Sequence, residues 1–182
     1  WKWYKLAAVQ EVAYAQSKLG TMYDNGNVVP QNYKTAAKWY TLAAKQGNAY
    51  AQSNLGNMYH DGNGVSQDDK TSVKWMRLAV KQGHAGAQSN LGVMYDNGQG
   101  VPQNDKTAVK WYSLAAAQGY AGDRCNRGVM YDNGRGVTPD DRTAVKCYRF
   151  GAQPGCASAQ NRLGLVYAQA RLRPRDHQIA RT

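Results

Sequence analysis

Apolar residues recur with a helical period along most of this chain. Two neighbouring segments each carry them at spacings of three or four residues, which is typical of one stripe on an amphipathic helix. The two stripes consist of Ala15, Leu19, Met22 and Tyr23, and of Ala36, Trp39, Tyr40 and Ala43. We therefore expect a pair of helices that each bury one face.

The same pair of helices returns every 36 residues. Leu-Gly stands at 19–20, 55–56, 91–92 and 163–164, and Arg127-Gly128 occupies the remaining place. A fixed period of this size is the signature of a repeat solenoid. We predict a first helix of each repeat, helix A, over 13–25, 49–61, 85–97, 121–133 and 157–169. Residues 1–10 match 37–46, so the chain opens with the second helix of a repeat, helix B.

Residues at the predicted helix ends support these boundaries. Helix B follows residues whose side chains can accept hydrogen bonds from free backbone N–H groups, namely Asn32, Asp68, Asn104 and Asp140. It ends before glycines, which adopt the left-handed cap most readily, namely Gly47, Gly83, Gly119 and Gly155. A glycine also lies within each helix A, where it costs about 1 kcal/mol relative to alanine. We expect these mid-helix glycines to mark close approach of two helices.

The repeated unit resembles a known family. It reads A-x-A-Q-x-x-L-G-x-M-Y-x-x-G-x-G-V, followed by A-x-x-W-Y-x-x-A-A-x-Q-G, and is similar to the Sel-one-like repeat (SLR), a relative of the tetratricopeptide repeat, over about 1–167. The resemblance implies an all-α fold, a right-handed α/α superhelical solenoid of antiparallel helix pairs with helix A on the concave side. It also implies a protein-binding scaffold or adaptor, a role common among bacterial exported and signalling proteins. The expected solenoid spans 1–170, as a half repeat over 1–12, repeats from about 13, 49, 85 and 121, and a partial one from 157.

Polar side chains on the outward side of helix A form the candidate binding face. At 100° per residue they lie opposite the predicted buried stripe. An asparagine amide can both donate to and accept from the backbone of a bound peptide. The candidate residues for a protein or peptide partner are Lys18, Asn54, Asn57, Asn90, Asn97, Asn126, Asn133 and Arg162. The alternative is that these side chains are only solvated.

A second row of candidates is cationic, in a chain whose net charge is +11. The basic residues occur four apart on helix B, where they would form two rows on the convex face: Lys34, Lys38, Lys70, Lys74, Lys106, Lys110, Arg142 and Lys146. Such rows attract an anionic partner, which could be nucleic acid, acidic protein or a lipid surface. Stacking aromatics are not interleaved with the lysines, which disfavours nucleic acid. Solvated lysines whose stems cover apolar surface are the other interpretation.

The sequence argues against catalysis, a metal or a cofactor. Some cysteine-rich members of the resembled family are associated with β-lactam binding or hydrolysis, but no S-x-x-K motif occurs here. The three histidines, His60, His84 and His177, lack a paired carboxylate or a metal-ligand spacing. Periodic Trp39, Trp75 and Trp111 are expected in the core or between repeats. We therefore predict that the chain is not an enzyme and holds no cofactor. A β-lactam-binding or hydrolysing enzyme is the least favoured function.

Cysteines and chain ends leave alternatives open. Three clustered cysteines are not a disulfide framework, and we favour free thiols over a bridge from Cys156 to Cys147 or Cys125. Residues 171–182 form an irregular basic tail that is either a cap or degenerate sequence. The start at Trp1 within a repeat suggests an incomplete N-terminus, whose open end could drive self-association. No apolar run approaches the length of a membrane span.

Overall fold

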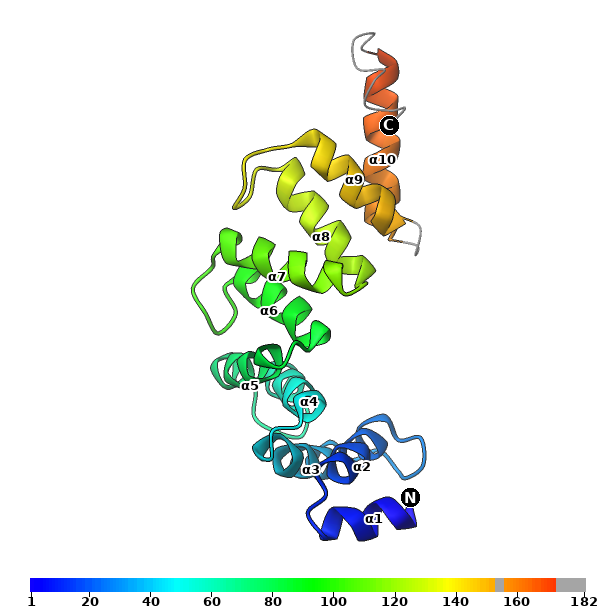
Figure 1. The fold of residues 1–182 in the computed structure, drawn as a ribbon, viewed down its shortest axis with the longest axis vertical. Helices are drawn as coiled ribbons and strands as arrows, with labels where there is room; N and C mark the ends of the chain where they lie inside the picture. Colours follow the sequence, from blue (N-terminus) through cyan, green and yellow to red (C-terminus); the bar gives the residue numbers. More distant parts are fainter. Residues whose placement is uncertain (153–155, 173–182) are drawn as a thin grey trace. The chain divides into compact units, whose positions relative to one another are not determined.

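The chain folds into α-helices that follow one another in consecutive pairs (Figure 1). The structure is a computed structural model, and it describes residues 1–152 and 156–172. Ten helices and no strand occur in those residues. The predicted class, an all-α solenoid of helix pairs, is confirmed.

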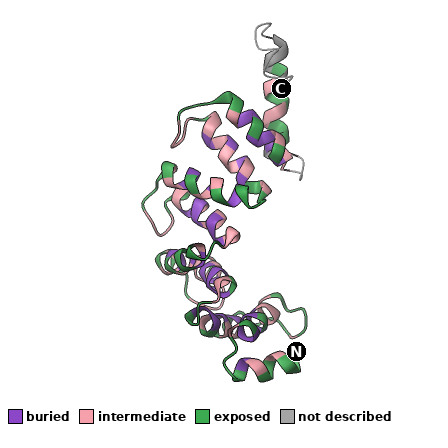
Figure 2. Cartoon of the chain, in the orientation of Figure 1, coloured by how far each residue is buried: buried purple, intermediate pink, exposed green. Residues whose placement is uncertain are grey.

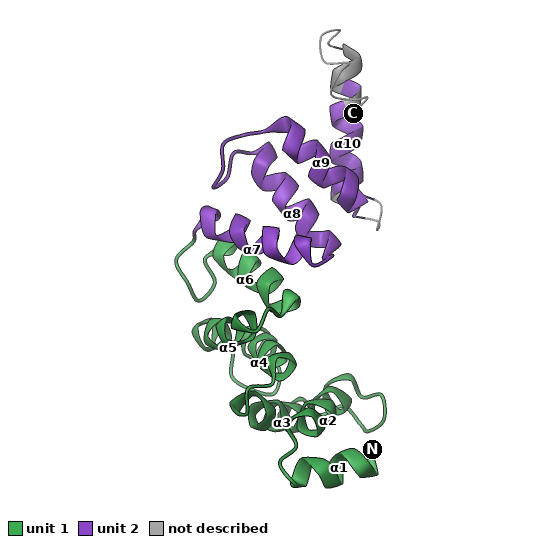
Figure 3. Ribbon diagram, in the orientation of Figure 1, with its two compact units in different colours: residues 1–103 green, residues 104–182 purple. Residues whose placement is uncertain are grey.

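The helices divide between two compact units (Figure 3). Unit 1, residues 1–103, holds α1 (Lys2–Val9), α2 (Ala13–Asn25), α3 (Tyr33–Lys45), α4 (Ala49–Asp61), α5 (Asp69–Lys81) and α6 (Ala85–Asn97). Unit 2, residues 104–182, holds α7 (Asp105–Ala117), α8 (Ala121–Asp132), α9 (Asp141–Ala152) and α10 (Ala157–Leu172). Within each unit every helix packs against the next along the chain. The even-numbered helices are therefore the predicted helices A, and the odd-numbered ones are helices B.

The predicted helix starts are confirmed at the level of single hydrogen bonds. Asn32 Oδ1 accepts from the Thr35 backbone N–H at 2.9 Å, and Asn104 Oδ1 accepts from Thr107 at the same distance. Asp68 and Asp140 cap α5 and α9 in the same way. These bonds satisfy donors that the first helical turn leaves free, so the capping residues fix the starts of α3, α5, α7 and α9.

The core runs between neighbouring helices as a line of small and medium side chains. Figure 2 shows how buried and exposed residues alternate along each helix. Around α3 and α4 the buried residues are mainly alanines with Tyr40, Leu55 and Met58, and the partly buried Trp75 packs against them. Trp39 packs against the cluster of Ala8, Ala15 and Leu19. The expected packing role of these two tryptophans is confirmed.

Three mid-helix glycines, Gly20, Gly56 and Gly128, mark close helix contacts, as expected, and Gly164 does not. A Cβ on Gly20 would lie 2.5 Å from Cδ1 of Tyr40, and one on Gly128 would lie 2.6 Å from Cε1 of Tyr148. In each pair the ring of helix B occupies the space that the glycine leaves open. Gly164 has no such neighbour within 4 Å among the described residues.

Pairs of glutamines, one buried and one exposed, join successive helices, a feature absent from the sequence-based expectations. Gln16 Nε2 donates to the Ala8 carbonyl at 3.1 Å, and Gln46 Nε2 donates to Gln16 Oε1 at 2.8 Å. The same two bonds recur one repeat later, where Gln52 donates to Ala44 and Gln82 donates to Gln52. Because Gln16 and Gln52 are each paired with a second glutamine and with backbone, their amides can be buried without an unsatisfied polar group.

Two expectations about cysteine and histidine are wrong. Cys125 of α8 and Cys156 form a disulfide, so the favoured set of three free thiols is reduced to the buried Cys147. His60 does have a carboxylate partner, Asp69, described below. Gly155, His177 and the tail over 173–182 lie outside the described residues.

Candidate functional site

The outward side of helices α2, α4 and α6 in unit 1 carries polar and aromatic side chains. The opposite side is buried: Leu19, Leu55 and Leu91 are at most 1% exposed. Lys18 is exposed, while Asn54, Asn57 and Asn90 are half-buried. We call the set Tyr14, Lys18, Tyr50, Asn54, Asn57 and Asn90 the helix A face of unit 1.

Two tyrosines of this face are well exposed and were not among the predicted site residues. Tyr14 is 58% exposed and Tyr50 is 69% exposed. The ammonium of Lys18 lies 5.2 Å from the Tyr14 ring centroid, and the Tyr50 ring meets the ring of His84 edge-on at 4.8 Å. The helical period already places positions 14 and 50 on the outward side of helix A. Exposed aromatic rings supported by neighbours are the kind of group that anchors a bound peptide.

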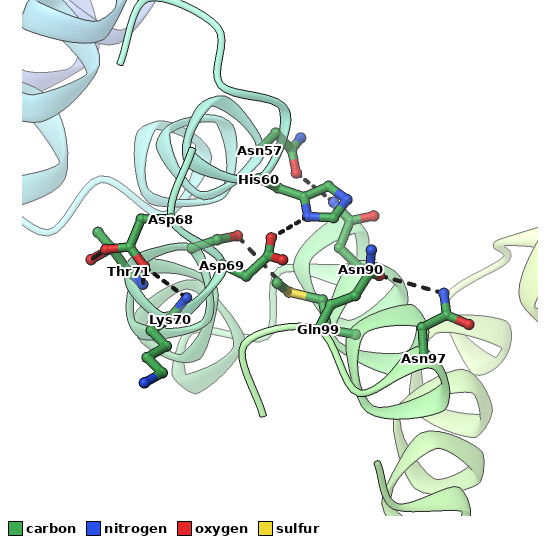
Figure 4. A network of polar contacts seen from close by, with 11 residues as sticks. Asn57, His60, Asp68, Asp69, Lys70, Thr71, Asn90, Asn97 and Gln99 are labelled. Carbon is green, nitrogen blue, oxygen red and sulfur yellow. Dashed lines mark hydrogen bonds and ion pairs between the residues drawn. The ribbon is translucent and has the colours of Figure 1, made fainter. Parts of the chain in front are cut away.

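Two of the predicted asparagines bond to each other across neighbouring helices. Asn90 Nδ2 on α6 donates to Asn57 Oδ1 on α4 at 2.7 Å (Figure 4). The bond uses one donor of Asn90 and one acceptor site of Asn57. An asparagine amide has two donors and a carbonyl with two lone pairs, so further groups remain on both side chains. The bond holds the two amides in a fixed relation on the helix A face.

Asn54 approaches a buried tyrosine rather than only solvent. Burial raises the pKa of Tyr40 to about 12, and hydrogen bonds with Thr21 and Asn54 oppose that rise. The Tyr40 hydroxyl lies 3.3 Å from Asp24 Oδ2, and burial also raises the pKa of the Asp24 carboxyl. Tyr40 therefore stays a neutral phenol that links α3 to α2 and reaches the edge of the helix A face.

Histidines serve helix ends in unit 1. His60 Nδ1 lies 2.6 Å from Asp69 Oδ1, so the last turn of α4 is tied to the first residue of α5 (Figure 4). His84 Nδ1 accepts from the Ala87 N–H at 3.2 Å and caps α6, in the place that Asn48 occupies on α4. Burial lowers the pKa of His84, which favours the neutral ring that can accept this bond.

The remaining predicted residues of this surface lie in less regular settings. Asn97 Nδ2 donates to Gln99 Oε1 at 3.4 Å beyond the end of α6. In unit 2, Asn126 is half-buried on α8 and Asn133 is exposed at its C-terminal end. Arg162 of α10 forms an ion pair with Asp132 at 3.2 Å, and the Tyr148 hydroxyl donates to the same carboxylate. Most of the predicted residues of this surface therefore have internal partners.

All eight predicted cationic residues of helices B are exposed: Lys34, Lys38, Lys70, Lys74, Lys106, Lys110, Arg142 and Lys146. Two aspartates at the starts of helices B bond elsewhere. Asp69 pairs with His60, and Asp105 pairs with Arg135 at 2.8 Å. Within the described residues, neither carboxylate is paired with a member of the cationic rows.

The groups on these surfaces are suited to recognition. They offer phenol rings, amides and cations, which bind peptide backbone, side chains or anions. Within residues 1–152 and 156–172, no three histidine, cysteine, aspartate or glutamate side chains gather as metal ligands would. Nor does any helix in that part of the chain have the length and apolar character that crossing a membrane needs.

Helix pairs repeated every 36 residues, joined through glycines and glutamines, define a repeat protein of the solenoid class. The Sel1 repeat model matches residues 13–48, 49–84, 85–120, 124–153 and 157–181. The chain belongs to the Sel1 repeat family, which confirms the resemblance found in the sequence. Proteins of this family generally act as protein-interaction scaffolds and are typically not enzymes.

Solved structures agree with this assignment. The chain is 42% identical, with a TM-score of 0.87, to a protective antigen of uropathogenic Escherichia coli strains that displays an SLR fold, covering 91% of this chain and 36% of the antigen. It is 40% identical, with a TM-score of 0.81, to a Sel1 repeat protein from Oxalobacter formigenes, covering 88% and 66% of the two chains. Cysteine rich protein B of Helicobacter pylori, at 22% identity and a TM-score of 0.56 over 75% of this chain and 98% of that one, shares the fold. No curated protein matches.

Proposed function

We propose that this chain is a non-catalytic scaffold that binds a peptide or protein along the helix A faces of its repeats. Exposed Tyr14 and Tyr50, standing on alternate helices beside hydrogen-bonding amides, carry the proposal. The role of Sel1 repeat proteins in protein interactions supports it. In unit 2 the residues Asn126, Asn133 and Arg162 would serve the same purpose on α8 and α10.

The chemistry of the face favours an extended, polar ligand. The Asn57 and Asn90 amides are already joined at 2.7 Å, so little side-chain freedom is lost when a peptide backbone pairs with their remaining groups. The two tyrosines add apolar contact area with a polar tip. Lys18, beside Tyr14, would favour a carboxylate on the ligand.

A peptide selection tests this function directly. Peptides would be selected from a random display library on the wild-type protein, and their affinities measured by fluorescence anisotropy. We expect Tyr14→Ala combined with Tyr50→Ala to weaken binding by about tenfold or more, because exposed interface tyrosines are frequent hot spots. Far-UV circular dichroism should be unchanged, since both rings are more than half exposed.

The matched control removes two exposed residues from helices B, Lys38→Gln with Lys74→Gln. Binding of the selected peptides should survive this change. The proposal fails if the selected peptides bind the tyrosine variant as tightly as wild type, or if the control variant loses them instead.

The anionic-partner alternative has its own support in the exposure of all eight basic residues on helices B. A preference for acidic sequences in the selected peptides, lost with Lys38→Gln and Lys74→Gln, would favour it over the helix A face.

A further inference from the structure

Every helix B exposes a large apolar side chain at the same place in the repeat. The exposed fractions are 40–56% for four leucines and one phenylalanine: Leu6, Leu42, Leu78, Leu114 and Phe150. They lie 36 residues apart, on α1, α3 and α5 of unit 1 and on α7 and α9 of unit 2. The leucines of α2, α4 and α6 in unit 1, by contrast, are almost fully buried.

The exposed leucine shares its side of the helix with lysines. On α3 the buried residues include Ala36, Tyr40 and Ala43. At 100° per residue, Lys38 and Leu42 point to the opposite side, about 40° apart. The same order, a basic residue four positions before the apolar one, occurs on every helix B: Lys2 with Leu6, Lys38 with Leu42, Lys74 with Leu78, Lys110 with Leu114 and Lys146 with Phe150.

The lysines of this side in unit 1 are not engaged in direct ion pairs with any described residue. None of its lysines on α1, α3 and α5 forms an ion pair within the described part of the chain. The nearest carboxylates in sequence form their direct bonds with other groups. Asp68 accepts from Thr71 and from backbone N–H groups while its charge still interacts with Lys74, and Asp69 pairs with His60. We call the set Lys2, Leu6, Lys34, Lys38, Leu42, Lys70, Lys74 and Leu78 the helix B face of unit 1.

We propose that the helix B face of unit 1 docks on the surface of an anionic lipid bilayer. Its lysines meet the phosphate headgroups and its leucines enter the apolar boundary beneath them. Lysines near an anionic surface and apolar side chains that reach below the headgroups act together in peripheral membrane binding. The same basic and apolar pair on α7 and α9 gives unit 2 an equivalent surface of its own.

Repetition favours a bilayer over the other anionic partners. The face presents the same lysine and leucine chemistry on each helix B, and a bilayer presents the same headgroups and acyl chains at every point. The surface of a folded acidic protein does not repeat in this way. A nucleic acid backbone repeats its charge but offers nothing apolar to the leucines. Lysines, as flexible point charges, also suit headgroups whose positions are not fixed.

Vesicle co-sedimentation of the full chain tests the proposal. We expect binding to mixed phosphatidylcholine–phosphatidylglycerol vesicles, no binding to phosphatidylcholine alone, and a decrease as salt rises. Lys38→Gln with Lys74→Gln should weaken binding by about tenfold or more. Leu42→Ser with Leu78→Ser should weaken it by about fivefold or more. Val28→Ser, which removes an apolar loop residue that is 58% exposed, should have no effect.

Several results would overturn the proposal. One is no binding to the anionic vesicles at low salt. Another is binding that the leucine variant leaves unchanged, which would reduce the contact to charge alone. A third is displacement of the protein from the vesicles by a competitor whose concentration of charged groups is lower than that of the anionic lipid. Such displacement by polyglutamate would assign the face to an acidic protein, and displacement by duplex DNA would assign it to nucleic acid. Circular dichroism of each variant verifies that the helices are intact.

Discussion

Replacing Gly20 by alanine tests the close contact between α2 and α3. The new Cβ would lie 2.5 Å from Cδ1 and 2.6 Å from Cε1 of Tyr40. The ring is fully buried and its hydroxyl is hydrogen-bonded, so it has no free end that could move away. Overpacking of this kind costs about 1–3 kcal/mol. Alanine returns about 1 kcal/mol through its higher helix propensity. Because the Tyr40 ring is rigid, the overpacking cost should lie near the upper end of that range. We therefore expect the free energy of unfolding to fall by about 2 kcal/mol in total.

The matched control is the same substitution at Gly164 of α10. A Cβ there would meet none of the described residues within 4 Å. Only the helix propensity changes, so Gly164→Ala should raise stability by about 1 kcal/mol. The two variants should therefore differ in free energy of unfolding by about 3 kcal/mol, measured by urea unfolding followed by circular dichroism. The packing argument is refuted if Gly20→Ala is as stable as wild type, or if Gly164→Ala loses stability.

Two further predictions concern His84 and the cysteines. In the folded protein, burial lowers the pKa of His84 below its ordinary value of 6.5. The unfolded chain therefore binds more protons than the folded one just below about pH 6.5. This contribution to stability should be complete above about pH 6.5 and should decrease as the pH falls below it. His84→Asn, which reproduces the Asn48 cap, should remove that part of the pH dependence of thermal unfolding, and equal pH profiles for both proteins would contradict the assignment. Thiol titration of the denatured chain should count one free thiol, Cys147, without reductant and three after reduction. A count of three before reduction would exclude the Cys125–Cys156 disulfide.

Local features of the fold could be predicted from the sequence because a few adjacent residues decide them. Asn32 and Asn104 cap α3 and α7 as expected, since a cap needs only a side chain and the backbone three residues on. The Gly20 and Gly128 contacts were predictable because glycine within a helix is costly without a packing reason.

Contacts between helices could not be read from the repeat period. The sequence aligned residues 36 apart, but Asn57 and Asn90 meet across 33 residues, and Gln16 and Gln46 across 30. Side chains on neighbouring helices meet at positions that depend on helix spacing and tilt, which the period does not contain. The same reason explains why the Cys125–Cys156 pair, 31 residues apart, was one open alternative among others.

The sequence predicted which side of helix A carries the candidate site, but the predicted site residues did not include the two exposed tyrosines, Tyr14 and Tyr50. The outward side of helix A follows from the helical period, so Lys18 and Asn54 were placed correctly on it. The same period puts Tyr14 and Tyr50 on this outward side, but they were not chosen as site residues because the asparagines were favoured as partners for a peptide backbone. The structure shows how far these two rings are exposed.

Hydroxyl-radical footprinting with a selected peptide tests the proposed binding face most directly. Side chains that the peptide covers should be oxidised more slowly when the complex is formed. The account predicts slower oxidation of Tyr14 and Tyr50 and no change at Leu42 and Leu78, all four of which are exposed in the free protein. Protection of Leu42 and Leu78 with unchanged oxidation of the two tyrosines would contradict it.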